Sequence, residues 1–407
     1  MTHLSSVLPV PPQRSAGRFA LAAALSSSLG QTFFIGLFGG QLREDFDLSQ
    51  SAFGALYGGA TLTSGLLMFW LGSLADHWSM RRSIALALSG LALGAALIAQ
   101  AQTVVGLIVA LFLLRLCGQG LAGHLAVVAA ARYARRRGRA VAMVSYGFIL
   151  GEAILPSAVA FAMIGMDWRE VWLTAAAASA VVALPTLVWL AWPLTHPLDL
   201  NRVQGRVEPG DVRTMTRRKL FSQASFLRVL TLVLLPAVVV TAVFLHQGTI
   251  AERLGWQLSD LASGFLLFAA LQGVFAFAGG RIVDRFSARV LLRVALLPAG
   301  FGLLALAVLD PAYSLWFLFA GVGMTSGLNG VITGAIWVEL FGLAQLGLIR
   351  GVYSALMVVS SALGPVFLGA LFDWQVSFMT MALAYLLYAL LVPVLVLPGL
   401  KPISDPV

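Results

Sequence analysis

The chain has 407 residues, of which 59% are hydrophobic and only 11% carry a charge. A soluble domain needs about a quarter of its residues charged to wet its surface, so this composition excludes a water-soluble globular protein and makes lipid the main solvent. The net charge of +9 does not indicate a nucleic-acid partner, because the basic residues lie in short segments between apolar runs.

The N-terminal segment 1–18 is polar and contains Pro9, Pro11 and Pro12. The apolar run that follows is too long for the core of a signal peptide and lacks a clear small-residue cleavage site, so it predicts a retained first helix. The single cysteine, Cys117, lies inside an apolar run and can form no intramolecular disulfide. We expect it to act as a small packing residue.

Apolar runs long enough to cross a membrane recur along the whole chain. A bilayer core of about 30 Å requires roughly 20 apolar residues in a helix. Twelve such runs are separated by short polar segments and by one longer polar stretch. The predicted spans are 19–40, 52–71, 83–101, 104–131, 140–164, 171–192, 226–247, 258–279, 290–309, 312–337, 352–372 and 377–397.

The loops alternate in charge. Arginines gather in every second loop, as in 132–139 and in the polar stretch 193–225, whereas the intervening loops carry more acids than bases. The positive-inside rule therefore places both termini and the central linker in the cytoplasm, with the chain as a multi-pass protein of the inner (plasma) membrane. The predicted division is a cytoplasmic tail (1–18), a first six-helix bundle (19–192), a cytoplasmic linker (193–225), a second six-helix bundle (226–397) and a cytoplasmic tail (398–407).

The two halves share short sequence patterns at corresponding places. A Gly-x-x-x-Asp-x-x-Ser-x-Arg pattern follows the second predicted span of each half. An Asp-Trp pair precedes the last span of each half, at Asp167 and Asp373. Two matches in the same order predict an internal repeat. The residues of the longer pattern are Gly72, Asp76 and Arg81 in the first copy and Gly280, Asp284 and Arg289 in the second.

The first copy of this pattern resembles the signature loop of the major facilitator superfamily, and a weaker second copy is typical of that family. The resemblance covers essentially the whole chain. It implies an all-α membrane fold of twelve helices in two pseudo-symmetric six-helix bundles, around a central cavity exposed alternately to each side. This sequence departs from the family pattern at His77, where arginine is usual, and at Ser79, where glycine is usual.

The signature residues can form a state-dependent contact. Gly72 and Gly280 permit close helix approach, and Asp76 and Asp284 can accept hydrogen bonds from loop amides, a helix N-terminus or arginines such as those at 81 and 289. Contacts that form in one state and break in the other would act as a gate. The alternative is an ordinary charged turn.

Three further segments resemble parts of the family. The run from Arg115 in the fourth span is similar to an arginine motif embedded in the membrane. The fifth span carries Gly147, Gly151 and Pro156, similar to the glycine–proline motif of exporters. The segment 42–46 is similar to the monocarboxylate and oxalate–formate branches, which favours small organic anions as substrates.

Two charges, Arg115 and Glu152, lie near the middle of apolar spans. A charge at mid-membrane costs at least about 2.5–3.5 kcal/mol, so it normally faces a cavity or a partner. Counting about 1.5 Å per residue from the span ends places both at similar depth. One interpretation is a switchable pair that couples protonation of Glu152 to binding of an anion by Arg115. The other is a fixed salt bridge.

Uncharged polar residues within the spans are further candidates for contact with a substrate. The resemblance implies that helices one, four, seven and ten line the cavity, although each such residue could instead bond to a neighbouring helix. His246 could also titrate. The residues His124 and Glu339 are expected to pair with nearby arginines. The candidates for substrate or proton coupling are Gln31, Tyr146, His246 and Asn329, besides Arg115 and Glu152.

The sequence thus predicts a proton-coupled secondary transporter of a small organic solute, with an organic anion slightly preferred. No ATP-binding motif or metal-ligand cluster is evident, and we expect no enzyme activity, cofactor, metal or nucleic-acid partner. The expected partners are the solute, protons and the bilayer, and the chain is expected to be a monomer. The alternatives are a proton-driven exporter of amphipathic drugs, a non-transporting membrane sensor and a membrane enzyme.

Overall fold

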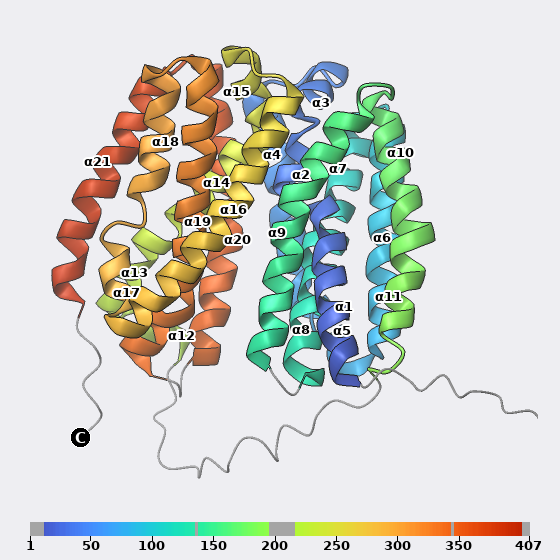
Figure 1. Cartoon of the computed structure of the whole chain (residues 1–407), viewed down its shortest axis with the longest axis horizontal. Coiled ribbons are helices and arrows are strands. Elements are labelled where there is room, and N and C mark those ends of the chain that lie inside the picture. The colour runs from blue at the N-terminus through green and yellow to red at the C-terminus, as the bar shows by residue number, and fades with distance from the viewer. Residues whose placement is uncertain (1–11, 135–136, 195–215, 343–345, 401–407) are drawn as a thin grey trace, which may run out of the picture. The chain divides into compact units, whose positions relative to one another are not determined.

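The computed structural model describes residues 12–134, 137–194, 216–342 and 346–400, and every regular element in these ranges is a helix (Figure 1). The predicted all-α fold class is confirmed. The chain forms two compact units. Unit 1 comprises Met1–Gln31, Thr63–Gly151 and Met166–Glu208, and unit 2 comprises Thr32–Leu62, Glu152–Gly165 and Pro209–Val407. The predicted linker lies mostly in 195–215, outside the described residues, so the boundary between the two six-helix halves stays a prediction.

Eleven helical segments of the described chain are long and apolar enough to cross a membrane. The remaining predicted span, 52–71, lies within the 22-residue helix α4 (Gln50–Leu71). The eleven segments are Ser15–Gly36, Met80–Gln100, Val104–Tyr133, Ala142–Ala162, Trp168–Leu190, Ala224–Leu245, Leu258–Arg285, Ala288–Val308, Pro311–Phe341, Leu346–Asp373 and Phe378–Val396.

The first span differs from the single helix that the sequence predicts. It begins earlier, at Pro12, and is broken at Gln31, whose backbone is extended (φ −88°, ψ 158°). The break directly follows Gly30, which packs closely against another helix, as described below. The segments are α1 (Pro12–Ser27), η1 (Ser28–Gly30), α2 (Thr32–Gly36) and α3 (Gly39–Asp45).

Four other predicted spans are also interrupted. In two of them a stretch of π-helix replaces α-helix, and in the other two a short non-helical step separates the pieces. The pieces are α7 (Val104–Leu113), η2 (Leu114–Ala122) and α8 (Gly123–Tyr133); α10 (Trp168–Ala178), η3 (Ser179–Ala183) and α11 (Leu184–Leu190); α13 (Ala224–Val233) and α14 (Leu235–Leu245); and α17 (Ala288–Leu292) and α18 (Leu297–Val308).

The other spans are continuous helices, and short helices join some of them. The continuous spans are α6 (Met80–Gln100), α9 (Arg137–Ala162), α16 (Leu258–Arg285), α19 (Pro311–Phe341), α20 (Leu346–Asp373) and α21 (Phe378–Val396). The short helices are α5 (Leu74–His77), α12 (Arg217–Phe221), α15 (Gln247–Leu254) and η5 (Leu397–Gly399).

Side-chain caps fix where many helices begin. Thr103 accepts a hydrogen bond from the Gly106 amide at the start of α7, and Ser377 accepts one from Thr380 at the start of α21. Asp167 forms a capping box with Glu170 at the start of α10. Each cap satisfies an amide that the first helical turn leaves without a partner.

The two repeated serines perform the same task in both copies of the pattern. Ser79 accepts a hydrogen bond from the Arg82 amide at the start of α6, at 3.4 Å, and Ser287 accepts one from the Arg289 amide at the start of α17, at 3.1 Å. Both are N-caps. The predicted repeat therefore extends from the sequence to local structure.

Candidate functional site

Arg115 lies on the π-helical stretch η2 of unit 1, where only 3% of the residue is exposed. Its Nη1 donates a hydrogen bond of 3.1 Å to the carbonyl oxygen of Gly30. A Cβ at Gly30 would collide with the carbonyl oxygen of Leu114 and lie 2.9 Å from the Cα of Gly118. The broken first span therefore packs backbone to backbone against η2. π-Helical turns occur often at functional sites, because they displace a residue from the regular helical register.

Two other predicted contact residues lie in unit 1. Gln31, which is half-buried, ends the 3₁₀ turn after α1. Tyr146 projects from α9 with 56% of the residue exposed. The structure gives neither of them a partner that would identify a ligand, so their role as substrate contacts stays a prediction.

The first copy of the repeated pattern is held mainly through backbone carbonyls. Nε2 of His124 lies 3.2 Å from the Gly72 carbonyl oxygen, and Arg132 donates to the Ala75 carbonyl at 2.9 Å. Arg81 lies over the ring of Trp192, 3.9 Å from its centroid, which is a cation–π contact. The backbone of Asp76 belongs to α5, but its side chain lies outside what the structure describes.

The second copy, in unit 2, is arranged differently. Arg289 donates to the Leu400 carbonyl at 3.4 Å, and Asp284 is exposed. A Cβ at Gly280 would meet nothing within 4 Å, so close packing does not explain that glycine. The predicted gate role of both copies stays a prediction.

Glu339 holds the turn of the second copy. Its carboxylate accepts hydrogen bonds from the Ser287 hydroxyl at 2.6 Å and from the Ala288 amide at 2.7 Å. Among the described residues, Glu339 therefore caps the start of α17 and forms no salt bridge with an arginine, where such a pair was expected. A carboxylate at a helix N-terminus is favoured by the amides and by the helix dipole.

Glu152 lies on α9, in the part of that helix that belongs to unit 2. It lies beside Gln272 of α16, within reach of a side-chain hydrogen bond. Oε2 of Glu152 and Oε1 of Gln272 are both buried, and neither has a hydrogen-bond partner among the described residues. Buried acceptors without donors are rare in native proteins and require an explanation. Arg115 belongs to unit 1, so its predicted pairing with Glu152 stays a prediction.

Asn329 lies within α19 beside another interrupted span of unit 2. Its Nδ2 lies 3.5 Å from the carbonyl oxygen of Val233, the last residue of α13. The side chain of Tyr353 from α20 lies within hydrogen-bonding reach of Asn329 and Thr333. Three elements of unit 2 thus bring polar groups together where helix geometry is broken.

His246 follows the span Ala224–Leu245 and is 1% exposed, so it does not face water. Its Nε2 lies 2.9 Å from the carbonyl oxygen of Pro365, and its Nδ1 lies 3.1 Å from Oε1 of Gln50. Burial lowers the pKa of His246 to about 4, and the charge of Arg43 acts in the same direction. The imidazole is therefore neutral at physiological pH and joins α4 to α20.

The contacts around Gln50 were not predicted from the sequence. The carboxylate of Asp373 accepts hydrogen bonds from the amides of Gln50 (3.0 Å) and Ser51 (2.9 Å), at the first turn of α4. Arg43 forms a salt bridge of 3.2 Å with Glu252, which joins α3 to α15, neighbours in Figure 1. The Asp-Trp repeat indicated that Asp373 is notable, but its hydrogen-bond partner Ser51 lies 322 residues away in the chain. We call the contacts of Asp373, His246 and Gln50 the α4 cap network.

Glycines bring α4 onto α20 beside this network. A Cβ at Gly54 would lie 2.5 Å from the Pro365 carbonyl oxygen, and one at Gly58 would lie 2.7 Å from that of Ala362. Such distances are far below normal contact, so only glycine permits the approach. The described residues contain no group of three or more histidines, cysteines or acids able to hold a metal ion.

The sequence matches the family model described as Major Facilitator Superfamily over residues 20–267 and 237–406. These two stretches cover nearly the whole chain and overlap in the middle. The chain belongs to the major facilitator superfamily. No curated protein sequence matches it significantly.

Solved structures of transporters share the fold of this superfamily member. A bacterial homologue of the human lysosomal transporter Spinster, in an inward-facing and occupied conformation, has a TM-score of 0.71 at 16% identity, over 98% of this chain and all of that one. The nucleoside transporter NupG gives 0.72 at 12%, over 96% and 100%. A D-xylose–proton symporter gives 0.69 at 18%, over 96% and 98%.

Family and fold together make the chain a multi-pass membrane protein of the secondary-transporter class. The similar structures are those of transporters rather than enzymes. None of the three is described as a monocarboxylate or oxalate–formate transporter, so that branch remains a prediction.

Proposed function

We propose that this superfamily member is a proton-coupled secondary transporter that moves a small organic solute by alternating access. Glu152 is the proton-binding residue in this proposal. The observation that supports it is the pair of buried acceptors, Oε2 of Glu152 and Oε1 of Gln272, for which the described part of the chain supplies no donor. A proton on Glu152 would supply one donor to this pair and remove a net charge from the span.

We infer that small organic anions are the first solute class to test, because Arg115 places a guanidinium group inside a span. A planar guanidinium suits a carboxylate, which it can bind through two parallel hydrogen bonds. Its contact with Gly30 ties any change at Arg115 to the break in the first span. Anion binding and helix geometry would therefore change together.

Flux into proteoliposomes with an imposed pH gradient tests the proposal. The panel contains monocarboxylates, dicarboxylates, nucleosides, pentoses and cationic dyes. Nucleosides and pentoses are included because transporters of those solutes share the fold. We expect gradient-dependent accumulation of at least one organic solute, and the absence of such flux for every compound would contradict the proposal.

The variant Glu152→Gln tests the proton-binding residue separately. Glutamine keeps the size and a hydrogen-bond donor but cannot exchange a proton, so we expect accumulation driven by the gradient to fall at least tenfold while solute exchange without a gradient persists. Glu44→Gln, at an exposed position of α3, is the matched control. Normal accumulation by Glu152→Gln would refute the role of this residue.

A further inference from the structure

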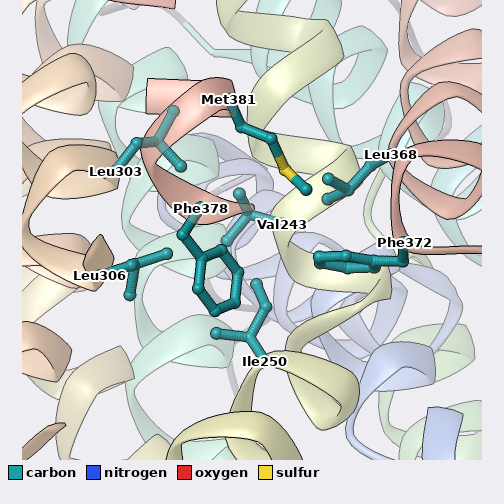
Figure 2. A pocket seen from close by; sticks show the side chains of 8 residues that line it. All are labelled: Val243, Ile250, Leu303, Leu306, Leu368, Phe372, Phe378 and Met381. Atoms are coloured by element: carbon teal, nitrogen blue, oxygen red, sulfur yellow. The ribbon is translucent and has the colours of Figure 1, made fainter. Parts of the chain in front are cut away.

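An apolar pocket lies in unit 2 among α14, α15, α18, α20 and α21 (Figure 2). Eight side chains line it, and all of them are apolar; the aromatic rings of Phe372 and Phe378 form part of the wall. The enclosed space is small, about 20 Å³, and the pocket opens to its surroundings. Sites for polar solutes present a few polar groups, and none of these eight side chains is polar. This pocket suits part of an aliphatic chain better than a polar solute.

The pocket lies close to the ends of its helices. Phe378 is the first residue of α21, Phe372 is the last but one of α20, and Leu306 is two residues before the end of α18. Exposed aromatic residues, Tyr313 and Trp374, lie near the same helix ends. Aromatic side chains gather at the level where lipid head groups meet acyl chains, so the pocket lies at that level.

A cation borders the pocket. The guanidinium of Arg253, on α15, lies 4.5 Å from the ring centroid of Phe372 and 6.0 Å from that of Phe378. Its Nη2 donates to the Phe372 carbonyl at 3.2 Å, and its side chain is exposed. Within the described part of the chain, no carboxylate forms a salt bridge with Arg253.

The acids next in the chain to Arg253 and to its contact Phe372 have other partners. Glu252 pairs with Arg43, and Asp373 accepts two amides of α4. Arg253 therefore presents a positive charge at the edge of an apolar pocket. A molecule with an anionic head group and an aliphatic tail would match both the charge and the apolar walls.

We propose that this pocket binds an acyl chain of an anionic phospholipid, whose phosphate contacts Arg253. Contact of methylene groups with the apolar walls supplies van der Waals attraction, and the guanidinium selects the anionic head group. The site does not depend on which solute the protein moves. A neutral apolar ligand is the competing occupant, and it would not require Arg253.

A bound lipid would stabilise the α4 cap network. The ring of Phe372 meets the imidazole of His246 edge-on, with centroids 5.8 Å apart, and the next residue, Asp373, caps α4. Filling the pocket restrains Phe372 and hence both neighbours. Because a ligand that binds only the folded state raises its stability, the lipid should raise the melting temperature.

The experiment uses the full chain, purified and delipidated in detergent. Phosphatidylglycerol and phosphatidylcholine with identical acyl chains are titrated in turn, and native mass spectrometry and thermal unfolding report retained lipid and stability. We expect the wild type to retain phosphatidylglycerol at least threefold more strongly and to melt at a higher temperature with it. Arg253→Gln should lose this preference, so that the two lipids are retained equally.

Two further variants locate the site. Met381→Trp fills the pocket and should lose retention of both lipids. Arg285 is an exposed arginine at the C-terminal end of α16, and Arg285→Gln should behave like the wild type. Equal retention of both lipids by the wild type, or an undiminished preference in Arg253→Gln, would overturn the proposal. Arg253 is exposed, so its variant tests the proposal even if Met381→Trp fails to fold. Displacement of the lipid by n-decane with equal efficiency in wild type and Arg253→Gln would favour the neutral occupant and also overturn it.

Discussion

Single polar residues in this protein act by satisfying backbone groups at breaks and ends of helices. Asp167 and Asp373 occupy equivalent places in the repeat, yet Asp167 caps the helix that follows it, whereas Asp373 caps α4. Arg115 and Glu339 likewise bond to backbone groups, at Gly30 and Ala288. Leaving such groups unpaired in an apolar environment would cost about 1–3 kcal/mol each. These side chains therefore determine which helix ends can meet.

His246 gives the protein a stability that depends on pH. Burial, aided by the charge of Arg43 and opposed by the Pro365 carbonyl and Asp373, lowers its pKa from 6.5 to about 4. Since the unfolded chain binds this proton more tightly, the contribution of His246 is complete above about pH 6.5 and is lost as the pH falls toward 4. The loss is at most about 3 kcal/mol. We expect the wild type to lose stability relative to His246→Gln over this range.

Thermal unfolding of both proteins in detergent, between pH 4 and 8, measures this difference. Glutamine keeps polar contacts with Gln50 and Pro365 but does not titrate. His77→Gln, at an exposed position, is the control and should follow the wild type. Parallel pH profiles for the wild type and His246→Gln would show that the imidazole does not contribute in this way.

At the scale of elements, glycine decides how closely the broken first span approaches η2. A methyl group at Gly30 would collide with the Leu114 carbonyl, and overpacking of this kind costs about 1–3 kcal/mol. We therefore expect Gly30→Ala to lower the melting temperature by several degrees and to reduce the yield of folded protein. Size-exclusion chromatography and thermal unfolding measure both effects.

Gly59 and Gly273 provide the opposite control, since a methyl group at either would meet nothing within 4 Å. Both lie inside helices, where alanine is favoured over glycine by about 1 kcal/mol. Gly59→Ala and Gly273→Ala should therefore leave stability unchanged or raise it. Equal loss of stability in all three variants would mean that contact with η2 is not the cause.

The positions of the spans could be predicted from the sequence because hydropathy and charge act locally. The segment 258–279 and helix α16 begin at the same residue. The approach of Gly30 to Gly118, beside the break at Gln31, could not be predicted, because the two glycines are distant in the chain. The bond from Asp373 to α4 depends in the same way on a distant partner. The sequence thus indicated that Arg115, Glu152 and His246 are unusual. It could not predict their respective neighbours, which are Gly30, Gln272 and Gln50.

At the scale of the whole molecule, the contacts that join the two predicted halves are the ones that alternating access would have to break. Helix α4 belongs to the first predicted half and α20 to the second, yet the first part of α4 (residues 50–62) lies with α20 in unit 2. The α4 cap network and the glycines Gly54 and Gly58 hold them together. If transport proceeds by alternating access, this contact must open and close in each cycle, whereas contacts within one half persist.

Cross-linking distinguishes the two kinds of contact. In a Cys117→Ser background, the pair Ser51→Cys and Asp373→Cys joins α4 to α20, where Asp373 accepts a hydrogen bond from the Ser51 amide. The pair Gly94→Cys and Leu113→Cys joins α6 to α7, where a Cβ at Gly94 would lie 3.1 Å from that of Leu113. We expect oxidation of the first pair to stop solute flux and reduction to restore it, because the closed contact cannot separate. Oxidation of the second pair should leave flux within about twofold of the reduced protein, since α6 and α7 move together. Flux is measured in proteoliposomes, with cross-link formation checked by mass. Undiminished flux through a fully cross-linked α4–α20 pair would show that this contact stays closed throughout transport.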